Sequence, residues 1–251
     1  MLMISRSNEI SRSDLAKIMT PDPTESWRPI AHFDVVNSLT ERAAARGLKI
    51  KNERFSVMDG TLYPQPGMQV SIKGARLFGS LDFEPIKGLT FPAGTTPSAG
   101  LRNSIDKSLA LSVLSGGRVL VCDNSVLSAE FIVSRKHTSG IDLNASIDQA
   151  LDAFMESIRG FTEMFEKLRA WKLRKSTAQS VVVELARAGA FSSSDILPVL
   201  QEYEQPKHSD FSERNAWSLY NAATERMKLQ SPARQVDGLK ALTSTITSFL
   251  N

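Results

Sequence analysis

Seven apolar residues recur in the second half of the chain at alternating intervals of four and three. They are Ile147, Leu151, Phe154, Ile158, Phe161, Phe165 and Leu168. This heptad spacing places one narrow apolar stripe along a long helix. A stripe left in water is unfavourable, so it must pack either within the chain or against a second copy. Further helical segments follow in the sequence, and they favour packing within the chain.

The long helix is expected over 146–175, and Ser146 with Gln149 resembles a capping box at its start. An earlier amphipathic helix is expected over 32–46, with Gly47 placed as its C-terminal cap. The later helices are expected at 177–190, 194–204, 212–229 and 232–250.

Between about residues 48 and 141 the pattern changes to short strands. We expect strands at 68–73, 77–83, 109–114, 118–122 and 131–133. Asp59-Gly60 and Ser115-Gly116-Gly117 are typical of hairpin turns, and the Pro/Gly/Thr-rich segment 85–100 predicts a long loop. Strands joined by hairpins without intervening helices favour an antiparallel sheet.

The predicted fold class is therefore α+β: an antiparallel sheet domain followed by a helical region with one long heptad-patterned helix. A polar N-terminal arm is expected over 1–30, the sheet domain over 31–143 and the helical region over 144–251.

Chemical signatures are sparse. The single cysteine, Cys122, excludes a disulfide framework and a cysteine-based metal site within the chain. His32, His137 and His208 are scattered, and no phosphate-binding loop is present. No apolar run approaches the roughly 20 residues of a transmembrane helix, and the amino terminus does not predict a signal peptide. We predict no catalytic residue, metal or cofactor, favour a non-enzymatic protein, and expect it in the cytoplasm.

Basic residues form three groups, although the formal net charge is only +3. The first group is Arg42, Arg46, Lys49, Lys51 and Arg54. The second is Lys167, Arg169, Lys172, Arg174 and Lys175 around Trp171, and the third is Arg135-Lys136 before His137-Thr138. Cations with an interleaved aromatic ring suit single-stranded nucleic acid. Alternatively, the second group complements its own helix dipole, and Trp171 continues the apolar stripe.

Four segments carry a family resemblance. Asn103-Ser104-Ile105-Asp106-Lys107-Ser108, preceded by Arg102, is similar to an Asn-Ser-His-Asp-Gly-Ser motif. Further similar segments hold Arg118, Cys122 and Asn124, then His137 and Thr138, then Trp217, Tyr220 and Asn221. Together they resemble the domain-of-unknown-function 932 family of phage/plasmid-like proteins over about residues 101–225.

The chain departs from that pattern at three positions. Ile105 stands where the family often has His, Lys107 where it has Gly, and Ser125 where a Gly follows Asn124. The loss of the histidine weakens a catalytic interpretation. For Asn103, Ser104 and Asp106 the alternative is structural, since short polar side chains bond the turn before the next strand.

The resemblance implies a protein of a mobile genetic element acting in a bacterial cytoplasm. Our leading hypothesis is a nucleic-acid-binding protein that prefers single strands, in recombination or annealing. Phosphate contacts are expected from Arg102, Arg135, Lys136, Lys172, Arg174 and Lys175, and base stacking from Trp171.

Two other hypotheses remain. One is a protein-binding factor that inhibits a host defence or regulates a host complex through the helical region. The other is a hydrolase built around Asp106 and His137. No membrane partner is expected, and self-association of the chain through the apolar stripe is the alternative to packing within it.

Overall fold

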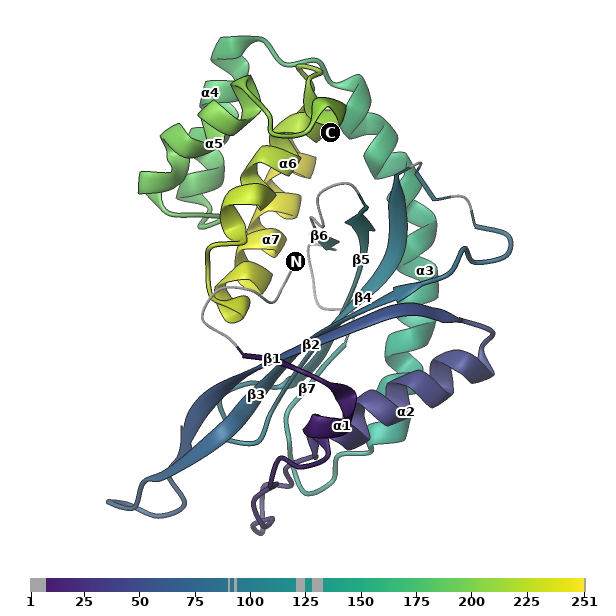
Figure 1. Ribbon diagram of the computed structural model, residues 1–251, viewed down its shortest axis with the longest axis vertical. Helices are drawn as coiled ribbons and strands as arrows, with labels where there is room; N and C mark the ends of the chain where they lie inside the picture. The colour runs from purple at the N-terminus through teal and green to yellow at the C-terminus, as the bar shows by residue number, and fades with distance from the viewer. Residues whose placement is uncertain (1–7, 90, 93, 121–124, 128–132, 251) are drawn as a thin grey trace.

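One antiparallel sheet forms the centre of the molecule, in a computed structural model that describes residues 8–89, 91–92, 94–120, 125–127 and 133–250. Its strands are β1 (Asn8–Ile10), β2 (Ile50–Leu62), β3 (Val70–Phe83), β4 (Thr95–Ser104), β5 (Leu111–Val119), β6 (Ser125–Leu127) and β7 (Val133–Arg135). They follow the order β1-β2-β3-β4-β5-β6, and β7 also pairs with β5 (Figure 1).

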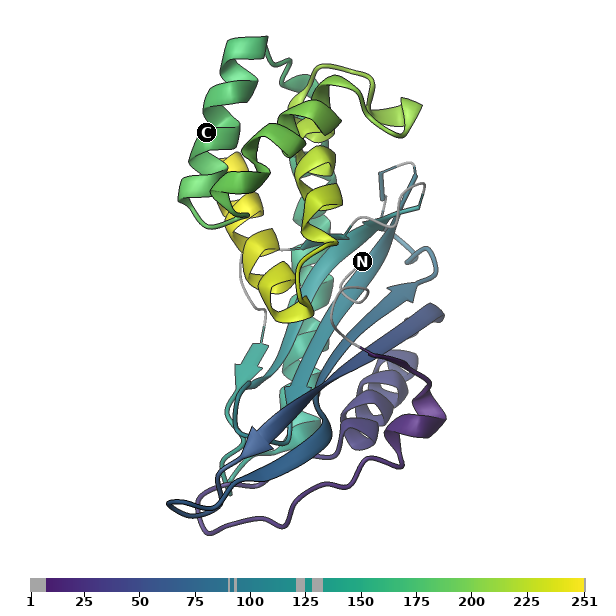
Figure 2. The same ribbon diagram turned by 60° about the vertical axis from the view of Figure 1, so that its left-hand side comes forward.

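Helices cover the sheet from two sides. Those of the amino-terminal half are α1 (Arg12–Leu15) and α2 (His32–Ala45). The others are α3 (Leu143–Ala170), α4 (Lys175–Arg187), α5 (Ile196–Glu204), α6 (Ala216–Met227) and α7 (Pro232–Ser248). Helices α2 and α3 lie against one face of the sheet, and α4 to α7 gather around the far end of α3 (Figures 1 and 2). The predicted α+β class, a sheet followed by helices, is confirmed.

Helix α3 connects two apolar cores. Its first four stripe residues, Ile147 to Ile158, pack with α2 and with the sheet residues Leu77, Leu81 and Phe83. The last three, Phe161 to Leu168, pack with α4, α6 and α7. All seven stripe residues are at most 4% exposed. The heptad stripe is therefore buried within one chain, as the sequence favoured.

Cap chemistry explains where the helices begin and end. Gly47 follows α2 with a φ of +74°, the left-handed conformation predicted for its cap. The capping box predicted at Ser146 is wrong, because Asp142 caps α3 by accepting a hydrogen bond from the Ala145 backbone N–H at 3.0 Å. Helix α3 ends at Ala170, so Lys175 belongs to the next helix.

The hairpin predicted at Asp59-Gly60 is wrong. Both residues lie inside β2, at a register shift, and the chain reverses over 63–69 instead. A Cβ atom at Gly60 would lie 2.1 Å from Oδ2 of Asp106. Glycine is therefore needed here for the close approach of a carboxylate and not for a turn. The segments predicted as separate strands at 68–73 and 77–83 join into β3.

The hairpin predicted at Ser115-Gly116-Gly117 is also wrong, because these residues form the middle of β5. Their small size lets neighbours approach the strand. Ser115 Oγ lies 2.5 Å from Ser157 Oγ of α3, and a Cβ at Gly117 would lie 3.0 Å from the Phe91 ring.

The long loop predicted over 85–100 is wrong in its last third, because β4 begins at Thr95. Pro97 pairs with Gly117 of β5, beyond the part of β4 that pairs with β3. A strand end of this kind tolerates proline. Residues 131 and 132 of the strand predicted over 131–133 lie outside the described residues. The third, Val133, begins β7.

Within the described residues, no helix is both long enough and apolar enough to cross a membrane.

Candidate nucleic-acid interface

The predicted phosphate-binding residues lie in three places. Arg135 ends β7, and its guanidinium donates a hydrogen bond to Gln149 near the start of α3. Lys172, Arg174 and Lys175 follow the other end of α3. Gln149 and Ala170 are 21 positions apart, which separates the two groups by about 30 Å along the helix. Arg135 and the exposed Lys136 therefore do not join the second basic group in one patch.

Arg102 lies in β4 on the sheet face opposite α2 and α3. Its neighbour Leu101 points into the core beneath those helices, and the alternation along a strand turns Arg102 the other way. The side chain is 14% exposed, and its guanidinium lies 4.0 Å from the carboxylate of Asp237 in α7. Burial lowers the pKa of Arg102, and Asp237 opposes that shift.

The segment after α3 is held by backbone hydrogen bonds. The Leu173 N–H donates to the Arg214 carbonyl at 2.8 Å, and the Ala216 N–H donates to the Trp171 carbonyl at 2.9 Å. Between them, Lys172 and Asn215 form an isolated antiparallel bridge. The backbone that carries Lys172 and Arg174 is therefore tied to the start of α6.

Five cations surround this bridge, and we name them the junction patch: Arg169, Lys172, Arg174, Lys175 and Arg214. The Lys172 side chain is 65% exposed and that of Lys175 is 72% exposed. Arg174 forms no ion pair with any residue that the structure describes. Arg214 is partly committed, since it donates to the Tyr203 and Glu204 carbonyls at the end of α5.

Carboxylates accompany two of these cations. Lys172 Nζ lies 2.7 Å from Glu213 Oε2, and Lys175 Nζ lies 3.1 Å from Glu204 Oε1. The hydrogen bond from Lys172 lowers the pKa of Glu213. Exposed pairs of this kind contribute little to stability and are screened by salt. A phosphate can therefore replace the carboxylate as the partner of the lysine.

Trp171 caps the end of α3 and is half-buried. Its ring stacks on Phe249, with the ring centroids 6.0 Å apart. The ring therefore extends the apolar core, as one interpretation of the sequence expected. Part of its surface still faces solvent, as stacking on a base would require.

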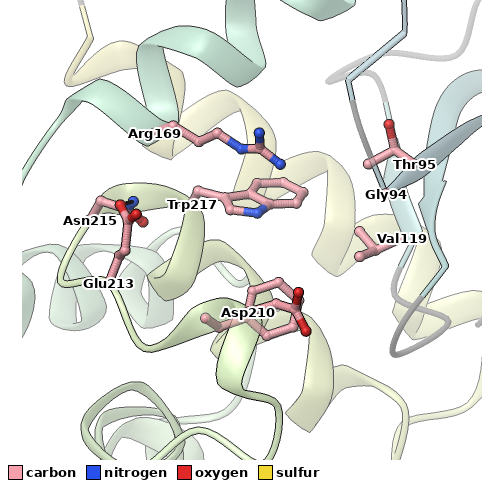
Figure 3. A pocket seen from close by; sticks show the side chains of 9 residues that line it. Gly94, Thr95, Val119, Arg169, Asp210, Glu213, Asn215 and Trp217 are labelled. Carbon is pink, nitrogen blue, oxygen red and sulfur yellow. Dashed lines mark hydrogen bonds between the residues drawn. The ribbon is translucent and has the colours of Figure 1, made fainter.

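A pocket of about 310 Å³ opens beside the junction patch, between α6 and the ends of β4 and β5. Figure 3 shows the Arg169 guanidinium above the Trp217 indole, the Asp210 carboxylate below it, and Thr95 with Val119 across the gap. The guanidinium carbon of Arg169 lies 6.0 Å from the Trp217 ring centroid, within cation–π range. The pocket therefore presents a cation and a carboxylate at one opening.

The residues of the Asn-Ser-x-Asp motif lie at the end of β4 and bond their surroundings. Asp106 accepts the Ser108 N–H at 3.0 Å and Arg76 Nε at 2.9 Å. Ser104 Oγ accepts the Leu109 N–H at 2.9 Å. For Ser104 and Asp106 these bonds match the turn alternative, with the added ion pair to Arg76.

Asn103 connects the sheet to the segment that leads into α2. Its side-chain amide donates to the Ile30 carbonyl and lies 2.9 Å from Nδ1 of His32. His32 Nε2 lies 2.9 Å from the Gly74 carbonyl, so the neutral ring has both nitrogens engaged. Burial lowers the pKa of His32 to about 4. Asn103 thus fixes the arm and the start of α2 to the sheet.

The two departures within this motif have physical consequences. Lys107 has a backbone φ of +68°, and no other non-glycine residue among those described has a positive φ. A left-handed conformation favours glycine, which explains the family residue at that position. Ile105 is fully buried, so the position at which the family often has histidine is part of the core here.

Arg118 forms the second buried ion pair, 2.9 Å from the Asp82 carboxylate, whose side chain has no exposed surface. Asp82 also accepts hydrogen bonds from Ser98 and from Asn52. Strand register places Arg118, Arg102 and Arg76 on the same sheet face. We did not predict Asp82, Arg76 or His32; cross-strand pairing, which the sequence does not state, brings them to the motif.

His137 is 5% exposed, and burial lowers its pKa. Its carbonyl accepts the Arg28 N–H, and Thr138 forms a bridge with Trp27. The His-Thr pair therefore holds the N-terminal arm. Asp106 and His137 share no hydrogen bond among those between described residues.

The carboxy-terminal motif is part of the core. Trp217 packs on Phe165 with centroids 4.4 Å apart, and Tyr220 OH lies 2.8 Å from Thr243 Oγ1. Asn221 donates to the Trp217 carbonyl at 2.9 Å. Cys122 and Asn124 lie outside the described residues.

Comparison with known proteins gave one match. The model of the family described as Domain of unknown function (DUF932) matches residues 94–247, more than half of the 251-residue chain. No curated protein and no solved structure matches it. The matched range runs from the start of β4 to α7 and contains all the motifs named from the sequence. The chain belongs to the DUF932 family, as its motifs predicted.

Proposed function

We propose that this protein binds nucleic acid, prefers single strands, and uses the junction patch as its phosphate-binding surface. The observation that carries the proposal is the exposure of Lys172, Arg174 and Lys175 on a backbone tied to α6. Cations on a fixed backbone neutralise phosphates without ordering a loop first, so little conformational entropy is lost on binding.

The preference for single strands follows from the neighbours of the patch. A pocket of about 310 Å³ opens beside the patch, and the half-buried Trp171 ring belongs to the same chain segment as Lys172. Both are suited to unstacked bases, which a duplex does not present. Arg135, Lys136 and Arg102 lie elsewhere, and in this proposal they are not part of the primary contact.

The biological setting remains part of the proposal. The phage/plasmid-like motifs favour a mobile-element protein in a bacterial cytoplasm, in recombination or annealing. We assign it no catalytic residue, metal or cofactor.

Salt dependence tests the proposal. Fluorescence anisotropy with a labelled single-stranded oligonucleotide should give a slope of log K against log salt near −3, as expected for about four phosphate contacts. Replacing Lys172, Arg174 and Lys175 with Ala should flatten the slope by about two. Trp171→Ala should weaken binding at nearly unchanged slope, because stacking releases no counterions. Absence of binding at low salt would contradict the proposal.

A protein-binding role is the second candidate, and one observation favours it. The β2–β3 hairpin has no charged residue over 60–72, and it exposes Tyr63 by 65% and Met68 by 51%. With Met19, which is 87% exposed, it borders a groove of about 650 Å³. An uncharged apolar tip suits a protein contact better than a nucleic acid.

This second candidate is a factor that inhibits a host defence or regulates a host complex. The exposed hairpin replaces the helical region, which the sequence had suggested, as its proposed contact surface. A photo-crosslinking residue at Tyr63 should capture one defined host protein in cells, and the same probe at Leu197, which is 70% exposed on α5, is the matched control. Equal crosslinking patterns from both positions would contradict it.

A further inference from the structure

The pocket beside the junction patch holds chemistry that phosphate binding does not use. The patch itself supplies cations for the phosphates of a single-stranded nucleic acid. Besides the Arg169 guanidinium, the pocket is lined by two acceptor-only groups, the carboxylates of Asp210 and Glu213. Its volume of about 310 Å³ is at the lower end of the range for ligand sites, so it accommodates one nucleoside and not a longer segment.

Several lining groups are already committed to the protein. Asn215 Oδ1 accepts the Ser218 N–H at the start of α6, and Asn215 Nδ2 donates to Glu213. Thr95 Oγ1 donates to the Pro92 carbonyl at 2.5 Å. The Trp217 ring is 4% exposed, because the core covers it. These residues shape the pocket, but they have little capacity left for a ligand.

Asp210, by contrast, is a lining residue whose side chain is not committed to the described part of the protein. It lies in the short 3-10 turn Ser209–Phe211, it is exposed, and its side chain accepts no hydrogen bond from any residue that the structure describes. Figure 3 shows its carboxylate below the Trp217 indole, on the side opposite Arg169. Asp210 is therefore an acceptor-only group available to a ligand at the pocket mouth.

We infer that this pocket binds one base of the strand and selects a base that carries an amino group. The inference rests on the proposed function. A carboxylate accepts hydrogen bonds but cannot donate them. The amino groups of cytosine and adenine donate at one side of the pairing edge. Thymine has a single donor there, N3–H, and it lies between two carbonyl oxygens that repel a carboxylate. The Arg169 guanidinium, held over the Trp217 ring on the other side of the pocket, adds donors for the acceptor atoms of such a base.

The experiment compares labelled dC15, dA15 and dT15 by anisotropy at one low salt concentration. The wild-type protein should bind dC15 and dA15 about fivefold to thirtyfold more tightly than dT15. Asp210→Asn should reduce that ratio below about twofold, since an amide both donates and accepts, and should leave dT15 affinity equal or higher. Glu184→Gln on α4, which also removes a partly exposed carboxylate, is the matched control and should keep the wild-type ratio.

The outcomes separate the two levels of the proposal. Failure of all three oligonucleotides to bind would overturn the proposed function, and the pocket assignment with it. Equal binding of the three would overturn base selection while the nucleic-acid proposal stands. A wild-type preference that Asp210→Asn leaves unchanged would overturn the assignment of Asp210 as the reading group.

Discussion

The two ends of helix α3 both attract basic residues, and they use them in different ways. At the amino-terminal end, Arg42 of α2 and Arg46, the cap residue after it, reach across to Asp148, and Arg46 also lies 3.0 Å from Asp152. These arginines are only 27–30% exposed. At the other end, Lys172 and Lys175 are 65% and 72% exposed and each contacts a single exposed carboxylate.

A basic run is structural where its cations share a carboxylate on a neighbouring helix, and it is open to a ligand where they do not. Both runs contain five cations in a short stretch, yet Arg42 and Arg46 of the first run join two helices, whereas Lys172 and Lys175 of the second face solvent. Shared partners explain this: Asp148 accepts from both Arg42 and Arg46, and these hydrogen bonds lower the pKa of its carboxyl. A network of this kind holds α2 on α3, whereas isolated exposed pairs exchange readily with other anions.

The largest expected effect comes from aromatic rings in the two cores that α3 connects. Phe154 is fully buried and lies 5.1 Å from Phe83 between ring centroids, so Phe154→Ala should reduce the free energy of unfolding by about 3–5 kcal/mol. Trp171→Ala, at a half-buried ring, should cost about 1 kcal/mol. Urea unfolding monitored by circular dichroism measures both. Similar losses of unfolding free energy in the two variants would show that the two rings are equally important for stability.

Acid should weaken the amino-terminal end through His32, which begins α2. Its pKa is about 4 in the folded protein and 6.5 in the unfolded chain, because burial disfavours the charged ring. The unfolded state therefore binds more protons between these values. Stability is fully present above pH 6.5 and should fall by about 3 kcal/mol as the pH approaches 4.

The check is urea unfolding at several pH values for the wild type and for His32→Gln, whose amide does not titrate. The variant should lose most of that dependence on pH, whereas His208→Gln, at a half-exposed position, should follow the wild type. An unchanged dependence in His32→Gln would contradict the assignment.

A pair of variants should separate stability from binding. Arg42→Ala with Arg46→Ala should lower the thermal midpoint by roughly 3 °C and leave oligonucleotide affinity unchanged. The triple alanine variant at Lys172, Arg174 and Lys175 should show the opposite pattern. Differential scanning fluorimetry and anisotropy on the same samples test this. A loss of affinity in the first variant equal to that in the second would show that both ends bind nucleic acid.

The smallest expected effect is at the carboxylates of the junction patch. Glu204→Gln frees Lys175, and Glu213→Gln frees Lys172. Each should tighten oligonucleotide binding by about twofold at low salt, with no change in thermal midpoint. Glu163→Gln, which frees Lys167 on the same helix, is the control outside the patch. Weaker binding in the two patch variants would argue that the carboxylates take part in the contact.

The sequence alone determined the elements whose signals are local or periodic. The 4-3 spacing from Ile147 to Leu168 predicted a long helix buried along one stripe, and the run from His32 to Gly47 predicted a helix with its cap. The motifs around Asn103 and Trp217 identified the family. Each of these signals lies within a few turns of one helix or within one short segment, so it needs no knowledge of distant partners.

Tertiary structure decided everything that depends on residues far apart in the chain. Gly60 and Gly117 were predicted as turns, yet they lie in strands, where the missing side chain leaves room for the close approach of Asp106 and Phe91. Strand register brought Arg76 to Asp106 and Arg118 to Asp82, pairs that no spacing along the chain indicates. The two basic runs look alike as sequence, and only the position of Asp148 on a neighbouring helix makes one of them structural. The role of a charge depends on the partner that the fold places within a few ångströms of it, and the sequence does not specify that distance.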